Sequence, residues 1–257
     1  MNWGKNALLF IIAAILAVVS LLLVFALVVD FVVEDSPTSS QLGIGGRTSY
    51  QPHTTYIPLV VNTPLPVLAS ESYNTKIDFT SQAPFGVWDA LHEETCEEAA
   101  LVMVYAWVNS LQFSPEFAEK EMLKLVEWQK SNLGYFENTS AGDTAKIAQT
   151  IYGLNPKILE NPSVKEIKFE IRQGNIVLMG MAGKLLNNPF FKPPGPAYHM
   201  LLLRGFDEKG FFVNDPGTRR GNNFFYTYEN LMEAAHDWNG SEETLLDSPA
   251  IALVFSR

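Results

Sequence analysis

Residues 88–104, WDALHEETCEEAALVMV, contain the only cysteine of the chain, Cys96, near their centre. From Glu97 onward apolar residues recur at helical spacing, so we expect Cys96 to stand on the first turn of a helix. The partial positive charge of a helix N-terminus favours a thiolate over a thiol, and this is a common way to prepare a cysteine nucleophile. A lone cysteine is also often a small buried apolar residue, so this stretch alone leaves both interpretations open.

The composition of the 257-residue chain narrows the classes of partner. Its formal net charge is −10, and only 18% of its residues are charged. Because binding to phosphates needs clustered Lys and Arg, this balance argues against a nucleic-acid partner. A single cysteine excludes an intrachain disulfide framework. The four histidines show no metal-ligand spacing, so we expect neither a metal nor another cofactor.

An uncharged, almost entirely apolar run covers residues 7–29. It exceeds the roughly 20 residues that a helix needs to cross a bilayer. A cleavable signal peptide is the competing interpretation, but its apolar core usually has only about 7–15 residues. Lys5 precedes the run and three acids lie within residues 30–35, which favours a cytoplasmic N-terminus. We therefore expect residues 1–33 to form a single-pass signal anchor in the cell membrane, with the remainder extracytoplasmic.

The rest of the chain divides into a tether and a folded domain. Residues 34–75 are dominated by Ser, Thr, Pro and Gly, a composition that buries little surface. Residues 76–257 are expected to be helical first, with helix starts at Ser114-Pro115, at Asp143 or Thr144, and at the capping box of Ser163. The expected strands are residues 176–181, 200–206, 211–214, 224–228 and 250–255. A helical half followed by an antiparallel sheet is an α+β layout.

Two polar residues stand at adjoining ends of two expected strands. His199 precedes the strand 200–206, and Asp215 follows the strand 211–214. Strands joined by a tight turn run antiparallel, so the start of the first lies beside the end of the second. His199 and Asp215 should therefore be neighbours, in the geometry by which a carboxylate orients an imidazole. A thiolate held against that imidazole would complete a Cys–His–Asp site.

Four blocks of this sequence together resemble one family. They are FTSQAP (79–84), CEEAAL (96–101), YHM (198–200) and VNDPG (213–217). Residues 76–256 resemble the bacteriocin-processing (double-glycine) peptidase-like family of papain-like cysteine peptidases. The resemblance implies a papain-like cysteine peptidase fold, in which the helical half carries the cysteine and the sheet half carries the histidine and the aspartate.

The resemblance also implies a role for each site residue. Cys96 corresponds to the nucleophile, His199 to the general base and then acid, and Asp215 to the orienting carboxylate. An upstream glutamine donates its side-chain amide into the oxyanion hole in this family, and Gln82 matches it. In the better-studied members that glutamine lies about one turn before the cysteine, whereas Gln82 lies much further upstream, so His92 is the other candidate donor.

Acidic residues follow the nucleophile where glycine is frequent in such sites. Glu97 and Glu98 suit a helix N-terminus, but their charge is expected to raise the pKa of the Cys96 thiol. Arg219 and Arg220 follow Asp215 in a polar loop, where they either meet a substrate carboxylate or are simply solvated.

Two functions remain open from the sequence. The first is a membrane-anchored, extracytoplasmic cysteine peptidase that cuts a peptide or protein substrate with a Cys-His-Asp triad. The alternative is a catalytically inactive relative that binds peptide in the same cleft while tethered to the membrane.

Overall fold

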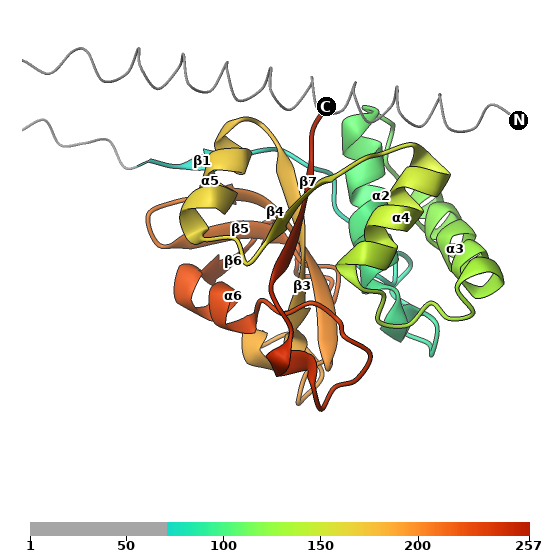
Figure 1. Ribbon diagram of the computed structural model, residues 1–257. Coiled ribbons are helices and arrows are strands. Elements are labelled where there is room, and N and C mark those ends of the chain that lie inside the picture. Colours follow the sequence, from blue (N-terminus) through green and yellow to red (C-terminus); the bar gives the residue numbers. More distant parts are fainter. Residues whose placement is uncertain (1–70) are drawn as a thin grey trace, which may run out of the picture. The chain divides into compact units, whose positions relative to one another are not determined.

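A computed structural model describes residues 71–257 (Figure 1). The expected signal anchor at residues 1–33 and nearly all of the expected tether lie outside these residues. No helix within residues 71–257 is both long enough and apolar enough to span a membrane. The described part has the expected α+β architecture, with helices packed on an antiparallel sheet.

An antiparallel sheet forms the centre of the described domain, with strand order β2-β7-β3-β4-β5-β6 and with β1 paired to β4. The strands are β1 (Tyr73–Asn74), β2 (Lys157–Glu160), β3 (Ile176–Ala182), β4 (Tyr198–Phe206), β5 (Gly210–Asn214), β6 (Phe224–Thr227) and β7 (Ile251–Phe255). The two central strands, β3 and β4, are buried along their whole lengths. Strands buried on both faces need cover on both sides, and two groups of helices provide it.

Helices cover the two faces of the sheet in separate groups (Figure 1). One face packs against α2 (Cys96–Val108), α3 (Pro115–Asn132) and α4 (Ala141–Tyr152), and the other packs against α5 (Val164–Arg172) and α6 (Tyr228–Ala234). Because side chains alternate along a strand, Leu178 and Met200 enter the first core, whereas Val177 and Leu201 enter the second. The cysteine therefore lies on the face covered by α2 to α4.

The helix starts follow from side chains that cap free backbone N–H groups. Ser114 accepts a hydrogen bond from the N–H of Phe117, as expected for α3. The capping box of Ser163 opens α5, which confirms that prediction. The predicted start of α4 at Asp143 or Thr144 is wrong by two or three residues, because Ser140 is the N-cap and Asp143 is its partner in a second capping box.

The five expected strands are all present, each with at least one shifted bound, and two further strands occur. β4 begins at Tyr198, so His199 lies inside the strand instead of before it. β2 was not expected, because its pairing with β7 leaves most of its side chains exposed and gives no apolar pattern. β1 lies at the C-terminal end of the segment that was expected to be a tether, and it pairs with β4.

A buried arginine holds the segment that follows β1 through hydrogen bonds to its backbone. Arg204 is 6% exposed, and its guanidinium donates to the carbonyl oxygens of Thr75 at 2.7 Å and Ile77 at 3.3 Å and to Asn214 Oδ1 at 3.0 Å. Five residues after Ile77, the backbone N–H of Gln82 donates to the carbonyl of Pro216 at 2.9 Å. These bonds hold Gln82 beside the end of β5, close to where Asp215 lies.

Candidate active site

Cys96 is the first residue of α2, and its side chain is 7% exposed. In the described part of the chain its thiol donates a hydrogen bond to Glu97 Oε2, 3.1 Å from Sγ, and not to His199. The backbone N–H of Met200, the residue after His199, lowers the pKa of the thiol and so lies near the sulfur. The nucleophile candidate thus lies against the start of β4, where His199 is located.

His199 and Asp215 form a buried pair at the β4–β5 end of the sheet. His199 Nε2 lies 2.7 Å from Asp215 Oδ1, and the two side chains are 1% and 0% exposed. Phe191 packs edge-on against the imidazole, with ring centroids 5.2 Å apart. Gly217 lies close to the same ring, because a Cβ there would be 2.8 Å from His199 Cε1. The imidazole therefore has one orientation, with Nδ1 as the ring nitrogen free for chemistry.

Two further residues hold Asp215. Its Oδ2 accepts hydrogen bonds from the Tyr226 hydroxyl at 2.7 Å and from Asn188 Nδ2 at 2.9 Å, while Oδ1 also accepts from the Gly217 N–H. Burial alone would raise the pKa of Asp215, but the charge of His199 and these hydrogen bonds hold it below its usual value. Neither Asn188 nor Tyr226 was singled out from the sequence, where no spacing or motif distinguishes them.

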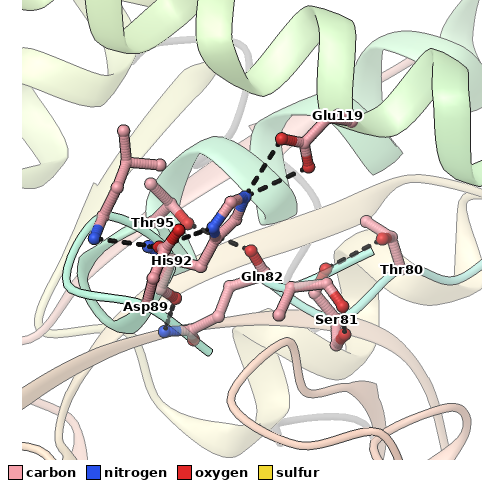
Figure 2. A network of polar contacts seen from close by, with 9 residues as sticks. Thr80, Ser81, Gln82, Asp89, His92, Thr95 and Glu119 are labelled. Atoms are coloured by element: carbon pink, nitrogen blue, oxygen red, sulfur yellow. Dashed lines mark hydrogen bonds and ion pairs between the residues drawn. The ribbon is translucent and has the colours of Figure 1, made fainter. Parts of the chain in front are cut away.

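Gln82 lies beside Cys96 although 13 residues separate them in the sequence. Figure 2 shows its side-chain amide next to His92, where Nε2 donates to the His92 carbonyl oxygen at 2.7 Å. The hydroxyl of Thr95, immediately before Cys96, donates to the Gln82 carbonyl at 3.2 Å. The two ends of the loop between Gln82 and Thr95 are therefore close together, and Gln82 lies at the site despite its separation from Cys96 in the sequence. One N–H of its amide is left for another acceptor.

The side chain of His92 is held away from the site. Its Nδ1 lies 2.7 Å from Asp89 Oδ1, and its Nε2 lies 3.1 Å from Glu119 Oε2 (Figure 2). Partial burial lowers the pKa of His92, but the hydrogen bonds and charges of Asp89 and Glu119 outweigh this and raise it. Because both ring nitrogens are engaged, the alternative of His92 as oxyanion donor does not fit. His92 instead presents its backbone carbonyl to Gln82.

Cys96, His199 and Gln82 line one cleft of about 700 Å³. This volume is in the usual range of binding sites for small ligands and peptide side chains. Trp88 and the start of α2 form part of its wall, and the loop before β4 adds Phe190 and Phe191. Arg219 and Arg220 line the cleft as well, and the guanidinium of Arg220 lies 4.7 Å from the centre of the Phe190 ring.

Two buried carboxyl groups adjoin Cys96. Glu97 and Glu98 are 3% and 2% exposed. Burial and the adjacent Glu97 raise the pKa of Cys96 well above that of an ordinary thiol. This is the effect expected of the acids, and it opposes the thiolate-favouring effect of the helix N-terminus. Burial likewise raises the pKa of Glu97 to about 7 and that of Glu98 well above its usual value.

Within residues 71–257 no group of three or more His, Cys, Asp or Glu side chains is placed to hold a metal ion. What the cleft brings together is a thiol, an oriented imidazole and an amide donor. These are the parts required for acyl transfer through a cysteine.

Comparison with known proteins identifies the family. No curated protein matches the chain. A crystal structure of a protein from Bacillus anthracis that is named a C39-like peptidase is similar, with 14% identity and a TM-score of 0.50 over 73% of this chain and 98% of that one. At this identity the likeness shows the fold alone. The model of the Peptidase_C39 like family matches residues 74–245, well over half of the chain. The chain therefore belongs to this family of papain-like, cysteine-peptidase-like hydrolases, to which its four sequence blocks pointed.

Proposed function

We propose that this protein is a membrane-anchored, extracytoplasmic cysteine peptidase whose triad is Cys96, His199 and Asp215. The observation that supports it best is the buried pair of His199 and Asp215, 2.7 Å apart, on the same cleft as Cys96. In a merely structural pair the imidazole would not need to face a cleft that holds the only cysteine of the chain.

The chemistry follows from which atoms are free. The Cys96 sulfur attacks the substrate carbonyl carbon and forms a C–S bond, while the carbonyl oxygen gains negative charge. The free amide N–H of Gln82 and the backbone N–H of Cys96 are the donors for that oxyanion. His199 Nδ1 takes the thiol proton and passes it to the leaving amine as the C–N bond breaks. Water then hydrolyses the thioester, with His199 as base.

The substrate proposed for this cleft is a peptide or protein segment. Trp88, Phe190 and Phe191 offer apolar surface near the nucleophile. Arg219 and Arg220 are exposed on the same cleft and are placed to meet a carboxylate of the substrate.

Membrane anchoring is proposed from the sequence, since residues 7–29 are apolar and are followed by acids. An alkaline-phosphatase reporter fused after Arg257 is expected to be active in intact bacterial cells, because this reporter folds only outside the cytoplasm. A fusion lacking residues 1–33 is the matched control and is expected to be inactive. An inactive full-length fusion, with normal expression, would contradict the orientation.

Peptide cleavage tests the catalytic proposal directly. Full-length protein incubated with a diverse peptide mixture between about pH 5.5 and 8 is expected to produce new termini, detected by mass spectrometry. Cys96→Ala is expected to produce none, because no other cysteine can take its place. Absence of cleavage by the wild-type protein throughout this range would reject the peptidase.

One observation favours the alternative of an inactive peptide-binding relative. The Cys96 thiol donates to Glu97 and its pKa is raised, so the nucleophile is not held as a thiolate. In that case peptides captured in the cleft remain intact, and Cys96→Ala binds them as tightly as the wild type. Cleavage of the bound peptide by the wild type, and not by Cys96→Ala, would decide for the peptidase.

A further inference from the structure

Glu97 contacts the reacting atom of the proposed nucleophile. Its Oε2 accepts the Cys96 thiol at 3.1 Å, and the side chain is 3% exposed. Its other oxygen, Oε1, is buried with no hydrogen-bond partner among residues 71–257. A buried carboxyl with one unsatisfied oxygen is costly when ionised, and the thiol is the side-chain donor that stabilises its charge.

Charged and titratable groups face Glu97 from each neighbouring element. Glu98 adjoins it on α2, Glu94 approaches from the short 3-10 helix His92–Glu94, and β4 contributes Tyr198 and His199. The remaining charged groups lie on the cleft wall. They are Glu93, Lys192, Arg219 and Arg220.

Within this group Glu97 is the carboxyl that titrates near neutral pH. Its pKa is raised to about 7. Burial is the largest cause and Glu94 adds to it, whereas the Cys96 hydrogen bond and the charge of His199 partly offset it. Glu98, held by Gln129 from α3, has a pKa well above its usual value because of burial and Glu97. Two adjoining buried carboxyls do not both ionise readily, so an ionised Glu97 favours the neutral form of Glu98.

We propose that ionised Glu97 holds Cys96 as an unreactive thiol, and that protonation of Glu97 releases the thiol to His199. This inference rests on the proposed function, because it concerns the nucleophile of the same site.

The proton balance of the proposed step is simple. One proton from solvent neutralises the Glu97 carboxylate, which is then a much weaker acceptor for the S–H hydrogen bond. The freed thiol passes its own proton to His199 Nδ1, and this forms a thiolate and an imidazolium. Asp215 stabilises the imidazolium through its 2.7 Å bond to Nε2. No oxidant or metal is consumed.

The single cysteine makes the test direct, since iodoacetamide labelling of the full-length protein reports Cys96 alone among cysteines. An ordinary thiol reacts faster as pH rises. Wild-type protein is expected to behave oppositely, with labelling about tenfold faster at pH 6 than at pH 8. Glu97→Gln keeps the shape of the side chain without its charge, and it is expected to react at least about tenfold faster than wild type at pH 8.

Two matched variants identify the route of the proton. Glu98→Gln makes the same change one residue away, without contact to the sulfur, and is expected to keep the wild-type pH profile. Glu97→Gln combined with His199→Ala is expected to lose the gain, because the acceptor of the thiol proton is missing.

Three outcomes would overturn the inference: wild-type labelling that rises with pH like a free thiol, a Glu97→Gln profile equal to wild type, or slower labelling of Glu97→Gln. The last would make Glu97 a base for the thiol. If Glu97→Gln does not fold, as judged by circular dichroism, the wild-type profile alone decides. Labelling needs no peptide, so failure here is distinguishable from failure of peptide cleavage.

Discussion

Replacing His199 with alanine is expected to lower kcat for peptide cleavage by about 10²- to 10⁴-fold, the usual contribution of a general acid–base residue. The loss is expected because His199 Nδ1 is the group proposed to carry the proton between Cys96 and the leaving amine. Asp215, Phe191 and Gly217 all hold this one ring. Initial rates at saturating peptide concentration measure the effect.

Two further variants serve as comparisons for His199→Ala. His236→Ala removes a histidine whose Nδ1 contacts the Ser248 carbonyl at 2.9 Å outside the cleft, and it is expected to leave kcat unchanged. Gly217→Ala adds a methyl group within 2.8 Å of His199 Cε1 and is expected to give an intermediate loss with a displaced pH profile. A His199→Ala protein within about threefold of wild-type kcat would show that the imidazole is not the proton carrier.

The free energy of unfolding is expected to fall by about 3 kcal/mol between about pH 4.5 and 8 through Glu97 alone. In the folded state burial raises the pKa of this carboxyl to about 7, whereas the unfolded chain releases the proton near the usual value. Between these two values the native state binds more protons, so stability falls as pH rises. The contribution is complete below the unfolded pKa and is lost as pH passes the folded pKa.

The difference between Glu97→Gln and wild type measures this contribution together with the effect of Glu97 on the titration of Glu98 and Cys96. We expect the two proteins to be about equally stable near pH 4.5 and the variant to be more stable by about 3 kcal/mol near pH 8.5, as measured by urea unfolding. His92 also loses stability as pH rises, since its folded pKa is raised, but it is present in both proteins and cancels. A difference that does not change with pH would contradict the burial of an ionising Glu97.

Local interactions account for what could be predicted of the fold. Ser114 and Ser163 cap helices with donors and acceptors that lie within three residues, so sequence spacing suffices to locate these starts. The start of α4 was predicted at Asp143 or Thr144 because both are polar residues typical of helix starts. In the structure Asp143 is instead the third helical residue, and it pairs with the N-cap Ser140 in a capping box. β2 was missed because an edge strand with exposed side chains shows no burial pattern.

The pairing of His199 with Asp215 was also predictable, for a topological reason. A tight turn makes β4 and β5 antiparallel neighbours, and that places the start of one beside the end of the other whatever surrounds them. The support of Asp215 by Asn188 and Tyr226 was not predictable, because these residues come from a loop and from β6 and meet only through packing.

By itself, the sequence determined the order of α2 to α5 and of β3 to β7, the identity of the sole thiol and the His199–Asp215 neighbourhood, since each depends on short-range spacing or on one hairpin. Only the tertiary structure decided how the stretch around Cys96 behaves. It brought Gln82 next to the residue before Cys96, engaged the ring of His92 with two carboxylates, and buried Glu97 against the sulfur. These depend on loop closure and on loss of solvent, and burial reverses the effect that a helix N-terminus alone would have on a thiol.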